Sequence, residues 1–133
     1  MQDNASEPTL YEGGCHCGRV RIRVRTRVRH ISECNCSICT KKGYLHLVVS
    51  KDELEILSGQ EELTEYRFNT GVARHLFCRT CGIHAFYVPR SDPNGYSVNA
   101  RCLEGIDLNS FSRRSFDGLH WEEAIVAHRA ARA

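Results

Sequence analysis

The spacing of eight cysteines constrains this 133-residue chain more than any other feature. Seven of them fall in three short clusters and one stands alone: Cys15-x-Cys17, Cys34-x-Cys36-x2-Cys39, Cys78-x2-Cys81 and Cys102. Cysteines this close in sequence form strained disulfides with one another but converge readily on one metal ion. The N-terminal residues lack the basic and apolar regions of a secretory signal, which favours a cytoplasmic protein with reduced thiols. The spacing therefore predicts metal binding rather than a disulfide framework.

Two of the clusters complement each other. Cys78 and Cys81 are followed by Gly82, a pattern typical of a zinc knuckle, in which a tight turn aims two sulfurs at one ion. A closed tetrahedral site needs a second pair of thiolates, and Cys15 with Cys17 can supply it. Such a site would tie the first strands of the fold to a late hairpin.

The remaining cluster, Cys34, Cys36 and Cys39, supplies three thiolates without an obvious fourth. Structural zinc sites have four protein ligands, whereas catalytic sites keep three and leave one position for water or substrate. Spacing alone leaves alternatives open here. Cys102 could complete a second four-cysteine site, and three local cysteines with a distant one could also hold an iron–sulfur cluster.

Length and composition fit one soluble domain. The chain has 133 residues, of which 41% are hydrophobic and 26% charged, ordinary values for a globular protein. Its longest unbroken apolar runs are four residues, whereas a membrane-spanning helix needs about 20. We predict a flexible polar extension over residues 1–10 and a single zinc-binding domain over residues 11–133.

Alternating residue types predict a mainly β fold. Arginine occupies every odd position from 19 to 29, and four of the five residues between them are apolar. This period of two is typical of a strand with one buried face, although the run is long enough that we expect a break within it. Further short β-like runs lie at residues 30–34, 44–49, 54–57, 63–68, 73–77, 83–88 and 96–100. The spacing favours small antiparallel sheets.

The C-terminal segment has a different pattern. Residues 119–132 are rich in Ala, Glu and Arg, with Trp121, Ala124, Ile125 and His128 on one helical face. We predict one C-terminal helix that packs this face on the sheet.

Three segments carry a recognisable family pattern: Gly14-Cys15-His16-Cys17-Gly18, Cys34-Asn35-Cys36-Ser37-Ile38-Cys39 and Phe77-Cys78-Arg79-Thr80-Cys81-Gly82. In this order they resemble the glutathione-dependent formaldehyde-activating enzyme family, which includes centromere protein V. The resemblance runs from about residue 12 to residue 127. Residues 66–70, 86–91 and 121–124 look closer to the centromere protein V branch.

The resemblance implies a fold, a ligand set and an activity. The fold is a β-tent of small antiparallel sheets, pinned by a zinc ion on Cys15, Cys17, Cys78 and Cys81. A second zinc ion would be held by Cys34, Cys36 and Cys39. Glutathione engages there as co-substrate, and its adduct with formaldehyde, S-hydroxymethylglutathione, forms. We therefore expect a carbon–sulfur lyase with two zinc ions, acting on a small thiol and a small carbonyl compound.

Four further residues are candidates for substrate binding. Lys41 and Lys42 directly follow the three-cysteine cluster, where they could meet the carboxylates of a glutathione-like ligand. Arg90 and Asn99 are candidates for lining the same pocket.

The arginine-rich segment supports a rival class of function. The rest of the chain has 12 basic residues (18 less the six arginines) against 16 acidic ones, so this segment alone carries the positive excess. Six arginines on one strand face could bind nucleic acid or an acidic protein, which would make the chain a non-enzymatic zinc module. The alternative is a solvated face neutralised by Glu61, Glu62, Glu65 or other carboxylates on neighbouring strands. No aromatic residues interleave with the arginines, so we do not expect nucleic acid to be the partner.

Overall fold

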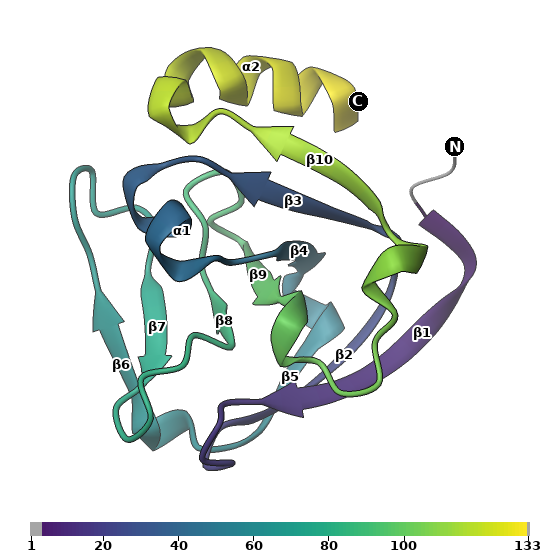
Figure 1. Ribbon diagram of the computed structural model, residues 1–133, viewed down its shortest axis with the longest axis vertical. Helices are drawn as coiled ribbons and strands as arrows, with labels where there is room; N and C mark the ends of the chain where they lie inside the picture. Colours follow the sequence, from purple (N-terminus) through teal and green to yellow (C-terminus); the bar gives the residue numbers. More distant parts are fainter. Residues whose placement is uncertain (1–3, 133) are drawn as a thin grey trace.

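The computed structural model describes residues 4–132, which form ten strands and two α-helices. The strands make three small sheets (Figure 1). The first sheet contains β1 (Asn4–Gly14), β2 (Arg21–Val28) and β5 (Leu54–Ser58), with β2 in the centre. The second has the order β10 (Ser112–Phe116), β3 (His30–Cys34), β4 (His46–Ser50), β9 (Gly95–Asn99) and β8 (Phe86–Tyr87). The third pairs β6 (Leu63–Tyr66) with β7 (His75–Cys78).

The alternation in β2 places its apolar residues in the core. Ile22, Val24 and Thr26 are fully buried, whereas the arginines between them are half-buried or exposed. Ile22 and Val24 belong to one continuous cluster with Leu47 of β4 and Phe86 of β8, so one core lies between the first two sheets. This burial stabilises the fold by about 1.5–3 kcal/mol for each large apolar side chain. The predicted mainly β architecture is confirmed.

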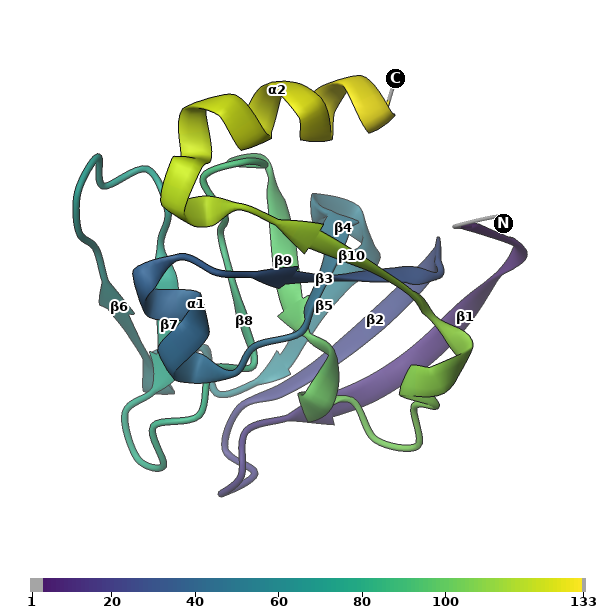
Figure 2. The ribbon, with the colours of Figure 1, turned by 45° about the horizontal axis from the view of Figure 1, so that its top comes forward.

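Both helices lie next to the edge of the second sheet that is formed by β10 and β3 (Figure 1). Helix α1 (Ser37–Lys42) directly follows β3, and Gly43 ends it in the left-handed conformation with φ of 64°. Helix α2 (Trp121–Arg132) runs along β10 at the edge of the molecule (Figures 1 and 2). Its predicted inner face is confirmed, since Ile125 is buried and the His128 ring meets Phe116 edge-on at 5.5 Å. No helix within residues 4–132 is long and apolar enough to cross a membrane.

The predicted extension over residues 1–10 is wrong from residue 4 onward. These residues lie in β1, where Thr9 pairs with Thr26 and Leu10 with Arg25. The sequence hides this strand because Pro8 and several polar residues break its alternation. An edge strand tolerates proline, and the register shifts between Asn4 and Thr9. Residues 1–3 lie outside the described part of the chain.

Two further observations concern strands, one that agrees with the prediction and one that differs from it. The expected break in the arginine-rich run is confirmed, since β2 ends at Val28 and β3 begins at His30. Strand β10 was not predicted because its sequence, Ser-Arg-Arg-Ser-Phe, offers one apolar residue in five. It pairs parallel to β3, whereas the other strand pairs are antiparallel.

Candidate functional site

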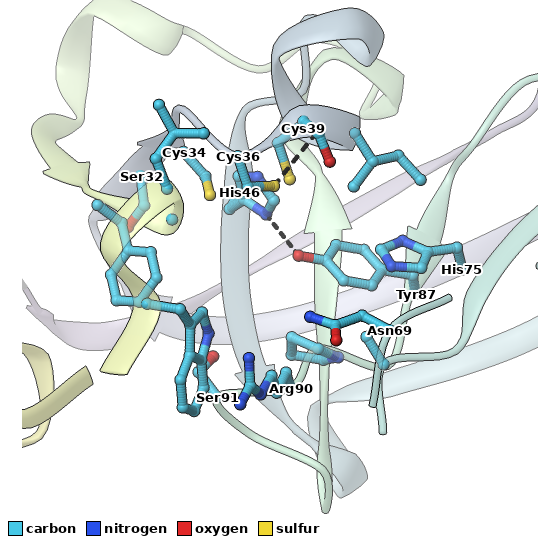
Figure 3. Close-up of a pocket in the computed structure, with 18 of the residues that line it drawn as sticks. Ser32, Cys34, Cys36, Cys39, His46, Asn69, His75, Tyr87, Arg90 and Ser91 are labelled. Carbon is cyan, nitrogen blue, oxygen red and sulfur yellow. Dashed lines mark hydrogen bonds between the residues drawn. The ribbon is translucent and has the colours of Figure 1, made fainter. Parts of the chain in front are cut away.

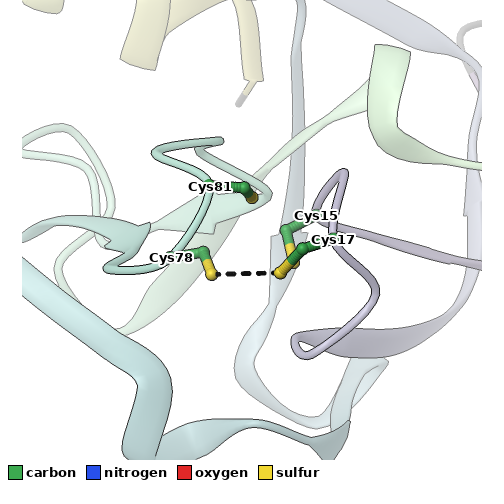
Figure 4. A group of neighbouring side chains, drawn as sticks. All are labelled: Cys15, Cys17, Cys78 and Cys81. Atoms are coloured by element: carbon green, nitrogen blue, oxygen red, sulfur yellow. Dashed lines mark hydrogen bonds between the residues drawn. The ribbon is translucent and has the colours of Figure 1, made fainter.

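Four cysteine sulfurs converge where the first sheet meets β7. Cys15 and Cys17 lie in the turn after β1, Cys78 ends β7, and Cys81 follows in a second turn (Figure 4). Their sulfur atoms all lie within 4.8 Å of one another. Gly18 and Gly82 adopt φ values of 84° and 78°, which only glycine takes without strain. The two turns predicted to form one four-thiolate site are therefore in contact.

The surroundings of this first cluster act unequally on its sulfurs, since burial raises the pKa of Cys15 to about 11 while Cys17 and Cys81 are shifted the other way. The backbone N–H of Val20 donates to Cys15 Sγ at 3.3 Å. Hydrogen bonds from the backbone and the guanidinium of Arg19 lower the pKa of Cys17. Burial acts to raise the pKa of Cys81, but backbone donors at Cys17 and Ile83 outweigh it and lower the value to about 6.

The other cluster forms where β3 passes into α1. Cys34 ends the strand, Cys36 caps the helix, and Cys39 lies one turn further on, so their sulfurs lie within 4.8 Å of one another. The N–H of Cys39 donates to Cys36 Sγ at 3.4 Å. Gly118 closes over the cluster, because a β-carbon built there would lie 2.6 Å from Cys34 Sγ. No pattern along the chain marks this close approach.

The three thiols act on one another. Hydrogen bonds with Cys34 and Cys39 lower the pKa of Cys36 to about 2. The bond with Cys36 raises the pKa of Cys34, and bonds with Cys34 and then Cys36 raise that of Cys39. A second or third thiolate in this cluster therefore needs a nearby cation. A divalent ion with affinity for sulfur satisfies that need.

This cluster opens into a pocket, whereas none of the four sulfurs of the first cluster lines it. The cavity measures about 440 Å³ and is lined by Cys34, Cys36 and Cys39 together with side chains from both later sheets and from α2. Such a volume suits a ligand of a few hundred daltons. The arrangement offers one face of a metal-binding cluster to a small molecule.

Buried rings form the inner wall of the pocket. His46 and Tyr87 hydrogen-bond each other, and His75 stacks on Tyr87 with ring centroids 5.0 Å apart (Figure 3). Burial lowers the pKa of His46 and of His75 to about 4 and raises the pKa of Tyr87 well above its usual value. These rings are therefore neutral near pH 7. The sequence analysis missed all three residues, which belong to three different strands and share no local motif.

The outer wall of the pocket is formed by Arg90, which follows β8, and by the start of α2, which follows β10. The guanidinium of Arg90 lies over the Trp121 ring, with its carbon 3.6 Å from the ring centroid. It also donates to Glu122 at 2.9 Å. Both contacts hold the cation in the wall of the pocket, where Arg90 is one of the lining residues (Figure 3).

Of the four predicted substrate-binding residues, only Arg90 lines the pocket. Lys41 is exposed on α1. The ammonium of Lys42 lies against His75 Nδ1 at 3.3 Å and over the Tyr87 ring at 4.6 Å. The amide of Asn99 donates to the His84 carbonyl. Lys41 and Lys42 are close to the cysteines in sequence but do not line the cavity. The direction of each lysine side chain depends instead on how α1 packs.

Cys102 belongs to neither cluster. Its sulfur lies 3.7 Å from the His84 carbonyl, and burial raises its pKa to about 11. The charges that act on it are those of Cys15 and Cys81, not those of the three-cysteine cluster. Within residues 4–132, the structure therefore offers no fourth cysteine to Cys34, Cys36 and Cys39.

Two arginines of the arginine-rich strand pair with carboxylates other than the three named above. Arg21 pairs with Glu104, and Arg23 pairs with Glu12 at 2.9 Å and with Glu55 at 4.0 Å. Glu62 and Glu65 instead pair with Arg79, Arg67 and Arg74. The difference arises because β1 and β5, not β6, flank β2.

Comparisons with known proteins agree with this arrangement. A sequence model of the glutathione-dependent formaldehyde-activating enzyme family matches residues 10–114, which hold every clustered cysteine. A Schizosaccharomyces pombe protein named as an uncharacterized lyase is 24% identical over 102 residues, covering 76% of this chain and 74% of that protein. The crystal structure of a Rhodobacter sphaeroides protein matches with 36% identity and a TM-score of 0.70, over 77% of this chain and 98% of that chain.

Proposed function

This chain belongs to the glutathione-dependent formaldehyde-activating enzyme family, and from that premise we propose that it is a zinc-dependent carbon–sulfur lyase. Its proposed reaction forms or breaks S-hydroxymethylglutathione, the adduct of glutathione with formaldehyde. One observation carries the proposal: three cysteine sulfurs meet at the wall of an open pocket without a fourth cysteine in the described residues.

Both cysteine clusters fit zinc. Four sulfurs within 4.8 Å of one another, with backbone N–H donors toward them, match a closed structural site. Three sulfurs beside a cavity match a site that keeps one position for an exchangeable ligand. Zinc in the second site would hold an entering thiol as thiolate and polarise a carbonyl oxygen. All eight cysteines are free, as expected for a protein of the reducing cytoplasm.

The residues around the three sulfurs supply binding and orientation. Arg90 can form a charge-assisted pair with a carboxylate of glutathione, and the Trp121 and Glu122 contacts hold its guanidinium in place. Phe68 and Trp121 give the cavity apolar walls. Of the four basic and polar candidates, we retain Arg90 as the ligand-binding residue.

The test is a glutathione titration followed at the zinc absorption edge. We expect glutathione to change the spectrum of the wild-type protein, and the protein to accelerate exchange between glutathione, formaldehyde and their adduct. Cys36→Ser should abolish both effects because the second site loses a ligand. Cys102→Ser is the matched control, since it removes a cysteine that lies in neither cluster, and it should behave as wild type.

Two results would contradict the proposal. One is an unchanged spectrum together with an unchanged exchange rate in the zinc-loaded wild-type protein. The other is a Cys102→Ser variant that loses one metal ion, because Cys102 would then close the second site and leave no position for a thiol.

A further inference from the structure

The pocket wall holds a buried histidine with one partnered and one unpartnered ring nitrogen. His46 is 5% exposed, and its Nδ1 lies 2.9 Å from Ser97 Oγ and 3.1 Å from the Tyr87 hydroxyl. Its Nε2 is buried and has no hydrogen-bond partner within residues 4–132. Proteins satisfy nearly all of their buried polar atoms. An unpartnered nitrogen in the wall of a ligand pocket therefore indicates an interaction with a ligand.

The surrounding hydroxyls assign the proton of this imidazole. The Ser97 and Tyr87 hydroxyls both lie within hydrogen-bond distance of Nδ1, and each has a proton to donate. A bare Nδ1 can accept these protons. An Nδ1 that carried its own proton would take away the acceptor that both buried hydroxyls share. The neutral imidazole is thus protonated at Nε2, the unpartnered atom.

We propose that the Nε2–H of His46 donates a hydrogen bond to the oxygen of the thiol adduct, a role that rests on the proposed lyase function. His46 and the three clustered cysteines line the same pocket, and the charge of Cys36 acts on the His46 ring. An adduct whose sulfur lies at the cysteines has its oxygen one carbon away, inside the pocket that His46 also lines. Tyr87 and Ser97 are then positioning residues, which keep Nδ1 bare.

The hydrogen bond matters at the step in which the carbon–sulfur bond changes. In the forward direction, the thiolate sulfur attacks the carbonyl carbon, the carbon–oxygen π pair moves to oxygen, and the resulting alkoxide takes a proton from water. In reverse, the hydroxyl loses its proton to water, the carbonyl re-forms, and sulfur leaves as thiolate. His46 keeps its own proton throughout and stabilises the negative oxygen in both directions.

The first experiment compares exchange kinetics in three variants. His46→Gln should lower kcat by about 10²-fold with KM nearly unchanged, as for loss of one donor to an oxyanion. Tyr87→Phe keeps the ring but lets the imidazole proton move to Nδ1, and it should lower kcat by about tenfold. His120→Gln changes an exposed histidine and should leave kcat as in wild type. A His46→Gln rate within threefold of wild type would overturn the proposal.

The second experiment does not depend on turnover. Nitrogen NMR of the zinc-loaded wild-type protein should show His46 protonated at Nε2, and addition of glutathione with formaldehyde should shift that N–H while glutathione alone shifts it little. A proton on Nδ1 would overturn the proposal. So would a His46→Gln variant that loses second-site zinc but turns over normally when reloaded, because His46 would then serve a cysteine sulfur. Wild-type protein without exchange activity would instead refute the lyase function, and the His46 role with it.

Discussion

Single cysteines in the two clusters have unequal roles. Cys78 is fully buried at the end of β7 and joins segments 61 residues apart, whereas Cys36 caps a short helix at the pocket. Metal binding at a structural site contributes on the order of 10 kcal/mol of folding free energy. We predict that Cys78→Ser unfolds the protein and that Cys36→Ser stays folded with one zinc fewer. Elemental analysis and circular dichroism would check this. A folded, one-zinc Cys78→Ser protein would contradict it.

The pH dependence of stability can be argued from His75. Burial, and then the neighbouring Lys42 ammonium, lower its pKa to about 4 in the folded state, against about 6.5 when unfolded. Because the folded pKa is depressed, this stability is complete above pH 6.5 and is lost as the pH falls toward 4. The loss from His75 alone is about 2 kcal/mol between pH 6.5 and pH 5. His75→Phe preserves the ring between Phe68 and Tyr87.

Urea unfolding at the two pH values, with zinc in excess, measures the effect. The free energy of unfolding of His75→Phe should fall by about 2 kcal/mol less than that of wild type over this interval. His120→Phe, an exposed position, should follow wild type. Equal losses in wild type and His75→Phe would show that His75 is not responsible.

At the scale of elements, the short 3-10 turn η5 (Gly118–His120) shapes the second site. A β-carbon at Gly118 would lie 2.6 Å from Cys34 Sγ and 2.6 Å from Cys36 Cβ, closer than atoms can approach. We predict that Gly118→Ala weakens second-site zinc by about tenfold or more, in the range seen when groups around metal ligands change. Ser115→Ala, on β10, is the control. Competition with a zinc chelator measures the affinity, and equal values for the two variants would refute the argument.

Local patterns predicted most elements and the cysteine clusters. A period of two located β2, and ligand spacings of one to three residues located both clusters, because these signals lie within single turns. The strands β1 and β10 escaped because pairing with a neighbour, not apolar alternation, holds them in place. The pocket residues His46, Tyr87 and Trp121 come from three distant elements, so no spacing along the chain marks them. The place of the Lys42 ammonium could not be predicted for the same reason, since the rings of Tyr44 and Tyr87 determine where it lies.

On the scale of the whole molecule, the first cluster links the sheets. Cys15 and Cys17 extend the first sheet, whereas Cys78 ends a strand of the two-stranded sheet. A metal ion there would close a long loop of chain, which is where a crosslink restricts the unfolded state most. The second cluster lies at one strand end and one helix, so the fold can keep its shape without that ion while the pocket loses its function.

The charge distribution tests the rival, non-enzymatic function. The positive excess lies on β2, but Arg21 and Arg23 are paired with carboxylates of the same molecule, which reduces the charge that this strand offers to phosphates. Exposed pairs contribute about 0–1 kcal/mol each. We therefore predict that replacing Arg21, Arg23 and Arg25 with glutamine keeps adduct exchange within a few-fold of wild type and lowers stability modestly.

The matched control removes the same charge elsewhere, by glutamine at the exposed positions Lys51, Arg101 and Arg129. Wild type and both triple variants should bind a mixed DNA or RNA oligomer equally weakly at physiological salt, because net charge alone then governs the contact. Fluorescence anisotropy over a salt series measures this. Tight, salt-sensitive binding that only the β2 variant loses would mean that the strand faces nucleic acid. In that case the two cysteine clusters would serve a binding surface, and the fourth position that Cys34, Cys36 and Cys39 leave open would need another explanation.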